Sequence, residues 1–244
     1  MSVQLPPMSA ARLRKLGVLR QWLGLRGYGT IAAAVSAAVA EGEMLDGTDI
    51  DKRELFTTLL SEARELSAEQ EALLVARLGT GRLGFYRGNN RSEVDYAFDL
   101  VAGWIVEDIL ALERNKRGQK IAHRGDDKAR DFLQAPTADP DFELEGRAVD
   151  LFADFTGTWT RQKYFDFKPG KWNRLMKGTE EVLCVDLSSD LGILISSARQ
   201  AIELCGGTAP EPSFNPRFGK ETYRIPTPPT SGWLGFESAY GLGG

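Results

Sequence analysis

The sequence of 244 residues contains one histidine, His123, and two cysteines, Cys184 and Cys205. A single histidine cannot supply a zinc site of several histidines, and it makes a histidine-based catalytic triad hard to assemble. Two cysteines are too few for a disulfide scaffold and are not spaced as a metal knuckle, which is typical of a reducing compartment. We expect both cysteines to be small core residues.

Long apolar runs are absent as well. The segment 31–40 is short, rich in alanine and followed by Glu41 and Glu43, whereas a membrane-spanning helix needs about 18 uncharged residues. The first seven residues lack the charged start and apolar stretch of a secretory signal. We therefore expect a cytoplasmic protein that is neither membrane-embedded nor secreted.

The composition is that of a folded protein with little overall attraction to polyanions. Hydrophobic residues make up 42% and charged residues 26%, near the averages for soluble globular proteins. The formal net charge is −4, so binding to nucleic acid would have to depend on a local basic patch. The length fits one main domain with a smaller appendage.

Helical periodicity dominates the N-terminal part. Capping signals and apolar spacing predict four helices, at about 9–24, 28–41, 51–63 and 67–78. We therefore expect a helical subdomain over 1–80. Glycines and asparagines from 79 to 90 interrupt the pattern, and a long helix with an apolar stripe is then predicted over 92–115.

From residue 142 onward the period changes to two. Residues 149–155 and 164–168 alternate between polar and apolar side chains, and a turn-like segment separates them, which predicts two strands of a hairpin. A third strand is predicted over 181–187. Apolar residues such as Leu191 and Ile195 then predict a helix that begins at Ser188 or Ser189 and ends before Gly206 and Gly207.

This alternation gives an α/β core over 81–206. The remaining segment, 207–244, is rich in proline and glycine, and we expect it to be an extended arm. Its scattered aromatic residues suggest that the arm wraps the body of the protein or a partner.

Polar residues of the predicted hairpin could form a catalytic site. With the turn centred near Thr158, Asp150 would lie opposite Asp166, and Lys168 would follow on the same side. Opposed carboxylates call for a cation or for exposure to water, and Mg²⁺ prefers oxygen ligands. Lys168 could then orient or deprotonate a water that attacks a phosphate. The alternative is a hairpin whose polar face is simply solvated, with Lys168 offsetting Asp166.

The pattern of Asp150 followed by Asp166-Phe167-Lys168 resembles the PD-(D/E)XK nuclease superfamily, particularly type II restriction endonucleases, over about 92–205. The resemblance implies a restriction-endonuclease-like central mixed sheet flanked by helices. It also implies Asp150 and Asp166 as Mg²⁺ ligands and Lys168 as a catalytic residue of an endodeoxyribonuclease.

The match to the family pattern leaves other acidic residues open. Val149 stands where the motif often has proline, and the literal Pro-Asp pair is Pro140-Asp141, so Asp141 is a rival first carboxylate. The resemblance also allows a ligand from the preceding helix, Glu107 or Asp108. Asp154 is interpreted as a solvated neighbour.

A basic segment next to this predicted site is expected to bind the DNA backbone. Its candidate DNA-binding residues are Arg161, Lys163, Lys171, Arg174 and Lys177. Palindromic target sites would require a homodimer. Two alternatives stay open: a non-catalytic DNA-binding or regulatory protein of the same fold, and a structural or assembly protein of the kind found in virions.

Overall fold

The computed structural model describes residues 10–40, 93–119, 121–123, 139–216, 219–229 and 232–239. The chain divides into two compact units: the first comprises 1–113 and 126–137, and the second comprises 114–125 and 138–244. The helices predicted from residue 51 to 78 and the glycine-rich segment after them lie outside the described residues. No described helix is long and apolar enough to cross a membrane.

The described part of the first unit is helical. Its elements are α1 (Ala10–Leu25), α2 (Ile31–Ala40) and α5 (Glu93–Lys116), whose last turn passes into the second unit. These helices confirm the predictions at 9–24, 28–41 and 92–115. Lys15 of α1 forms an ion pair with Asp99 of α5, and the Tyr28 hydroxyl donates to Glu113 Oε1 at 3.0 Å. Polar contacts therefore join α1 and the loop after it to α5.

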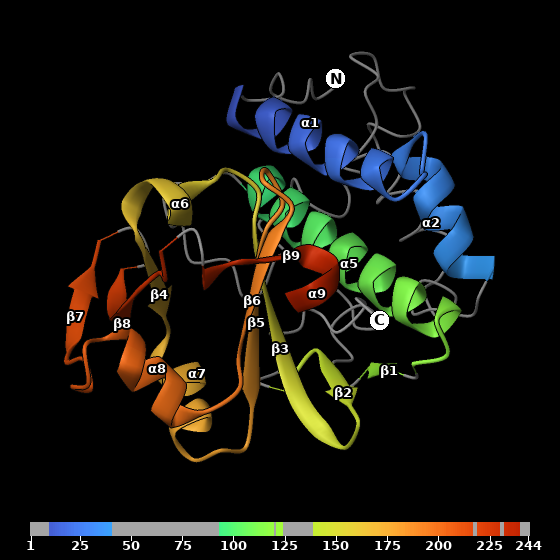
Figure 1. Ribbon diagram of the computed structural model, residues 1–244. Coiled ribbons are helices and arrows are strands. Elements are labelled where there is room, and N and C mark those ends of the chain that lie inside the picture. The colour runs from blue at the N-terminus through green and yellow to red at the C-terminus, as the bar shows by residue number, and fades with distance from the viewer. Residues whose placement is uncertain are drawn as a thin grey trace. The chain divides into compact units, whose positions relative to one another are not determined.

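The second unit is built on a six-stranded mixed sheet in the order β1-β2-β3-β5-β6-β9. Its strands are β1 (Ile121–His123), β2 (Phe142–Leu144), β3 (Arg147–Asp154), β5 (Glu181–Asp186), β6 (Leu191–Ile195) and β9 (Leu234–Gly235). Strands β3 and β5 pair in parallel, and the other neighbours are antiparallel (Figure 1). The predicted class, a mixed α/β protein with a mixed sheet, is confirmed at this level.

Strand β4 (Tyr164–Phe167) belongs to a separate three-stranded sheet in the order β4-β8-β7 (Figure 1). Its partners are β7 (Pro212–Asn215) and β8 (Lys220–Pro226), which lie in the segment expected to be an arm. The predicted hairpin of 149–155 with 164–168 is therefore wrong. The short helix α6 (Thr158–Gln162) replaces its turn, and it separates β3 from β4.

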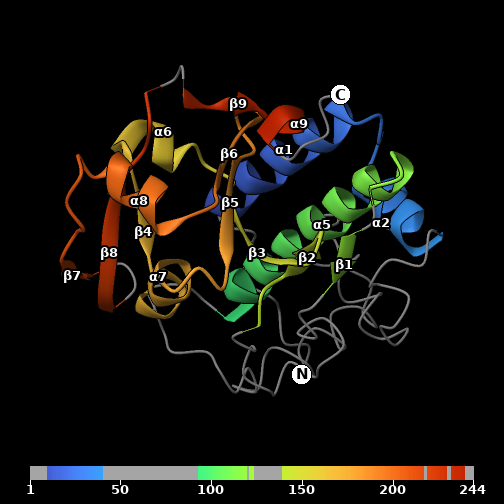
Figure 2. The ribbon, with the colours of Figure 1, turned by 60° about the horizontal axis from the view of Figure 1, so that its bottom comes forward.

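A hydrophobic core joins the two sheets of the second unit. Apolar side chains on one face of β5 and β6 pack against Phe165 and Phe167 of β4. Helices α7 (Pro169–Met176) and α8 (Ala198–Leu204) lie alongside β8 (Figure 2). They contribute Trp172 and Ala201 to the same core. Strand β8 adds Ile225. The segment after residue 207, expected to be an extended arm, therefore contributes strands and core residues, and α9 (Phe236–Ala239) ends its described part.

The helix predicted directly after β5 is wrong in its first half. Asp190 adopts a left-handed conformation with φ of 54°, which turns the chain back so that β6 pairs antiparallel with β5. Helix α8 starts only after Ser197, whose side chain accepts from the Gln200 amide nitrogen at 3.2 Å. An apolar run of this length fits a buried strand as well as a helix, which is why periodicity misassigned it.

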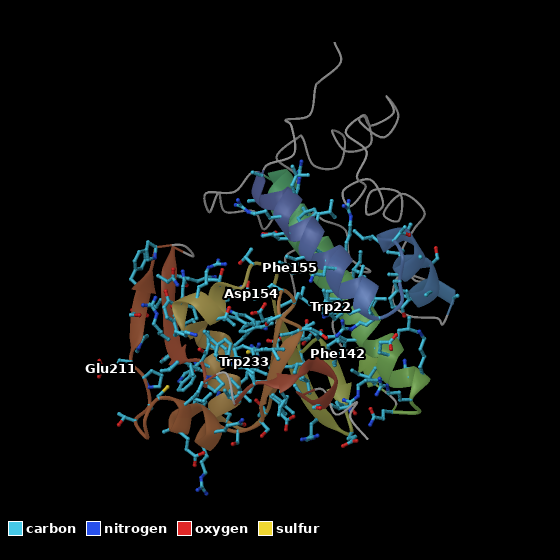
Figure 3. The ribbon with its side chains drawn as sticks, turned by 45° about the horizontal axis from the view of Figure 1, so that its top comes forward. Trp22, Phe142, Asp154, Phe155, Glu211 and Trp233 are labelled. Atoms are coloured by element: carbon cyan, nitrogen blue, oxygen red, sulfur yellow. The ribbon has the colours of Figure 1, made fainter. Side chains whose placement is uncertain are left out.

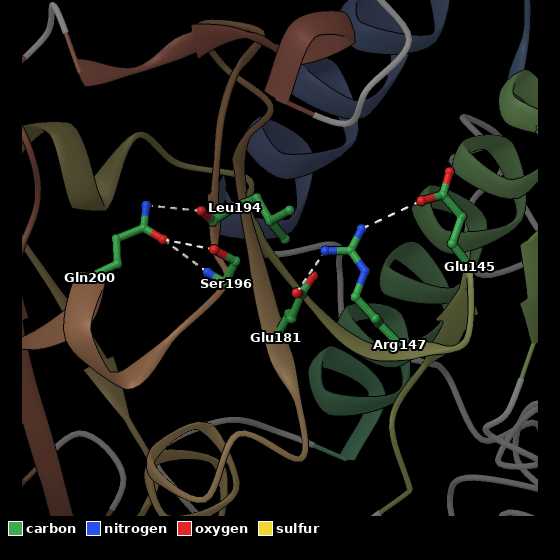
Figure 4. A network of polar contacts seen from close by, with 6 residues as sticks. All are labelled: Glu145, Arg147, Glu181, Leu194, Ser196 and Gln200. Atoms are coloured by element: carbon green, nitrogen blue, oxygen red, sulfur yellow. Dashed lines mark hydrogen bonds and ion pairs between the residues drawn. The ribbon is translucent and has the colours of Figure 1, made fainter.

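Side-chain contacts fix the ends of the central strands (Figure 4). The Gln200 carboxamide accepts from the Ser196 amide nitrogen at 2.9 Å and donates to the Leu194 carbonyl at 3.1 Å, so α8 is tied to the end of β6. At the start of β3, Arg147 Nη1 donates to Glu181 Oε1 at 2.9 Å. This contact links β3 and β5 across the parallel pair.

Candidate active site

Asp150 carries its charge inside the second unit. It lies on β3, and only 3% of its side chain is exposed. Its carboxylate forms an ion pair with the Lys171 ammonium group of α7, and Arg174 Nη2 lies 4.0 Å from the same Oδ2 atom. The Lys171 ammonium group also lies 4.4 Å from the centre of the Phe152 ring. A buried carboxylate is costly unless it is paired, and α7 supplies the paired charges.

A second buried carboxylate completes this charge cluster. Glu180 precedes β5, its side chain is 1% exposed, and its Oε2 atom accepts from Arg174 Nε at 2.5 Å. Lys171 and Arg174 are three residues apart and share one face of α7, as helical spacing requires. The four residues Asp150, Lys171, Arg174 and Glu180 are called the α7 charge cluster below.

Asp141 brings a further carboxylate next to β3. It directly precedes β2, where Phe142 pairs with Val149 of β3, so continuing that register places Asp141 opposite Asp150. Its Oδ2 atom accepts from the Leu151 amide nitrogen at 2.6 Å. Within the described part of the chain, its other oxygen has no recorded hydrogen-bond partner. The literal Pro-Asp pair of the sequence therefore lies beside Asp150.

A pocket of about 300 Å³ is lined by sequence neighbours of Asp141, Asp150 and Glu180 and not by these three residues themselves. It is lined by Asp139, Pro140, Glu143, Gly146, Ala148 and Thr179. Ala148 shares a face of β3 with Asp150, since the two are two residues apart. The lining side chains include two carboxylates and no basic group, so a negatively charged substrate would need a cation to enter.

Asp166 does not join Asp150. Strand β4 pairs with β8, and Asp166 Oδ1 lies 3.3 Å from Arg224 Nε and 3.4 Å from Thr222 Oγ1. The Phe167 ring packs edge-on against Phe152 of β3 with centroids 5.2 Å apart. Because neighbouring residues of a strand face opposite ways, Asp166 points away from β3. The predicted opposition of Asp150 and Asp166 is therefore wrong.

The predicted basic residues separate into two groups. Lys171 and Arg174 belong to the α7 charge cluster, whereas Lys163, Lys168 and Lys177 are exposed. Lys168 directly precedes α7, where Pro169 takes the first helical position.

The last of the predicted DNA-binding residues, Arg161, is held by a backbone contact. Its Nη1 atom donates to the Thr156 carbonyl at 2.6 Å. The two residues proposed as an extra ligand, Glu107 and Asp108, lie on α5 in the first unit.

A second pair of buried carboxylates stands at the other end of β3. Asp154 and Asp186 are register partners at the carboxyl ends of β3 and β5, and they are 7% and 0% exposed. The sequence interpretation treated Asp154 as solvated and missed Asp186. A usable signal was present, because each aspartate is followed two residues later by a hydroxyl residue, Thr156 or Ser188.

Metal-binding capacity in the described residues is limited to carboxylate pairs, because no cluster of three or more His, Cys, Asp or Glu side chains is arranged to hold an ion there. Cys184 lies on β5, and burial raises the pKa of its thiol strongly, although the nearby Lys171 charge lowers it in part. The thiol therefore stays protonated and does not act as a nucleophile or a ligand.

Comparison of the chain with protein-family models, with curated protein sequences and with solved structures gives no match. The chemistry of the charged residues on β3 is therefore the basis on which a function is assigned.

Proposed function

We propose that this protein hydrolyses DNA phosphodiester bonds with Mg²⁺, using Asp141, Asp150 and Lys171. In this proposal Asp141 and Lys171 replace Asp166 and Lys168 of the sequence-based site. The observation that carries it is the junction of β2, β3 and α7, where the Asp150 carboxylate pairs with the Lys171 ammonium group and Asp141, directly before β2, binds the Leu151 amide next to Asp150. A mixed sheet preceded in the chain by a long helix is compatible with a restriction-endonuclease-like core.

Asp141 and Asp150 are the residues that would hold Mg²⁺. The ion prefers oxygen ligands and keeps several waters, so two carboxylates and phosphate oxygens are a sufficient set. The contact from the Leu151 amide fixes Asp141 and leaves its other oxygen available. A bound ion would polarise the phosphate and acidify a water.

The basic residues of α7 have a part in this chemistry that needs no metal. Lys171 neutralises Asp150, and its ammonium group would also attract a phosphate oxygen of a bound substrate. Arg174 is held by Glu180 and supplies a second fixed positive charge. The Phe152 ring beside Lys171 keeps the ammonium group partly desolvated, which strengthens its attraction to an anion.

One observation favours a second candidate, a DNA-binding protein that does not cut. Asp150 is almost completely buried, and Lys171 already satisfies its charge. The same geometry is therefore that of a structural ion pair that fastens α7 to the sheet. In that case exposed lysines such as Lys163 and Lys177 would contact phosphates without any catalysis.

Cleavage of supercoiled plasmid DNA in Mg²⁺ or in EDTA tests the two candidates. We expect Mg²⁺-dependent nicking by the wild type, and a loss on the order of 10²-fold or more for Asp141→Asn, Asp150→Asn and Lys171→Met. Asp166→Asn should cut like the wild type. Far-UV circular dichroism and gel filtration establish that each variant is folded.

Each outcome of this assay distinguishes the catalytic candidate from the non-catalytic one or tests the position of the site. A wild type that binds the plasmid in a gel-shift assay but does not cut with Mg²⁺ or Mn²⁺ supports the non-catalytic candidate. A wild type that cuts while folded Asp150→Asn cuts equally well refutes the site. Loss of cutting in Asp166→Asn, with Asp150→Asn still active, would return the site to β4.

A further inference from the structure

Asp154 and Asp186 form a like-charged pair in the interior of the second unit. They are register partners on adjacent parallel strands, whose backbones lie about 4.8 Å apart, and their side chains share one face of the sheet. Figure 3 shows Asp154 at the end of β3, beside Phe155. Their exposed fractions of 7% and 0% mean that water does not solvate the charges.

The donors to this pair in the described part of the chain are neutral. Asp154 Oδ1 accepts from the amide and the hydroxyl of Thr156, and its Oδ2 accepts from the Trp159 amide, each at 2.9 Å. Asp186 Oδ1 accepts from the amide and the hydroxyl of Ser188 at 2.9 and 2.6 Å. Among the described residues no lysine or arginine forms an ion pair with either carboxylate.

One carboxylate oxygen of the pair receives no hydrogen bond from the described residues. Asp186 Oδ2 is fully buried and has no hydrogen-bond partner in the described part of the chain. An unpaired buried carboxylate oxygen beside a second carboxylate is strongly unfavourable unless a cation or a proton is present. The nearby guanidinium group of Arg161 donates to the Thr156 carbonyl and does not pair with either aspartate.

We propose that Asp154 and Asp186 bind one divalent cation, with Ca²⁺ as the best fit, in a site separate from the proposed hydrolase site. The two charges of the pair balance those of the ion. The hydroxyls of Thr156 and Ser188 lie within hydrogen-bond distance of the two carboxylates, and the Thr158 hydroxyl lies 2.6 Å from that of Thr156. Such a donor set suits a hard cation.

The burial of the site separates Ca²⁺ from Mg²⁺. Mg²⁺ demands near-octahedral geometry and keeps several waters, whereas Ca²⁺ accepts irregular sets of six to eight oxygen ligands. Carboxylates that are nearly inaccessible leave little room for retained waters. A Cβ atom at Gly157 would lie 3.0 Å from Ser188 Oγ, so the two loops that carry the hydroxyls are already in contact.

The proposed cation site is independent of the hydrolase site. Asp150 and Asp154 are four residues apart on β3, about 13 Å along an extended strand. A cation at the end of the strand would hold the loop after β3 against the turn between β5 and β6. It would therefore stabilise the fold whether or not the protein cuts DNA.

Thermal unfolding and calorimetry of the full chain test the proposal. After treatment with EDTA and its removal, we expect added Ca²⁺ to raise the melting temperature in a saturable way and to bind with a stoichiometry of one tight site. Asp150→Asn should keep both effects, because it alters only the other end of β3. Asp186→Asn and Asp154→Asn should lose them, and Asp186→Asn should be more stable than the wild type without Ca²⁺.

Three results would overturn the proposal. Absence of Ca²⁺ binding by the wild type in calorimetry is the first, and it needs no variant to fold. Ca²⁺ stabilisation that survives in Asp186→Asn is the second. Loss of the effect in Asp150→Asn, with retention in Asp186→Asn, would assign the ion to the other site. If the wild type shows no Ca²⁺ effect and gains stability only on mild acidification, a proton balances the pair instead.

Discussion

Replacing Lys171 by methionine should destabilise the protein far more than a typical surface substitution. Methionine keeps most of the length and apolar surface of lysine, so packing against Phe152 is largely preserved. What is lost is the charge that neutralises Asp150, whose side chain is 3% exposed. The variant therefore isolates the cost of leaving a buried carboxylate without its main partner.

The size of the effect follows from the burial of the two partners. Removing one member of a fully buried ion pair costs roughly 3 to 5 kcal/mol. Lys171 keeps 18% of its side chain exposed, and Arg174 Nη2 remains 4.0 Å from Asp150 Oδ2, so part of the charge stays compensated. We expect a loss of about 2 to 4 kcal/mol in the free energy of unfolding.

Urea unfolding followed by tryptophan fluorescence measures this loss, with the m-value as a check that the transition is unchanged. Lys177→Met, at the exposed end of the same helix, is the matched control and should be nearly neutral. The double variant Asp150→Asn with Lys171→Met should recover much of the lost stability, because no buried charge is left alone. If Lys171→Met is no more destabilising than Lys177→Met, the pair does not hold α7 on the sheet.

Three further predictions concern the rest of the second unit. Asp166→Asn should cost at most about 1 kcal/mol in urea unfolding, since its partner Arg224 is half exposed; a loss near that of Lys171→Met would refute this. Ser197→Ala should cost about 1 kcal/mol by removing the cap of α8, while Ser197→Asp should not. Burial raises the pKa of Cys184, so stability should be fully present below the unfolded thiol pKa near 9 and fall as pH rises above it; Cys184→Ala should flatten that slope.

Local patterns in the sequence predicted which face of a strand a side chain occupies better than they predicted which strands pair. Alternation over 164–168 correctly separated buried Phe165 and Phe167 from the side that holds Asp166. It could not show that β4 pairs with β8, because a period of two fixes which face a side chain takes and not which strand lies alongside. Arg224 is 58 residues from Asp166 in the chain, and no local signal announces that pairing.

The residues of the candidate site could be predicted only in part, because local patterns identify strand residues but not the elements that pack on them. The strand position of Asp150 was predicted correctly, but its burial was not, and Asp141 was named as a rival because it carries the literal Pro-Asp pair. Lys171 was placed in a DNA-binding patch instead of beside Asp150, since α7 was not predicted at all. A helix of eight residues that starts at a proline gives too short a pattern for periodicity to detect.

The two ends of β3 handle buried charge in opposite ways, and the connections that follow them explain why. At Asp150 the strand lies beneath α7, whose helical spacing delivers two cations to one face. At Asp154 and Asp186 the strands run into tight turns of threonine, glycine and serine, whose amides and hydroxyls donate to the carboxylates, while the nearby Arg161 side chain donates to the Thr156 carbonyl instead. The protein therefore neutralises the first site with its own residues, and the second site requires a cation or a proton from solution.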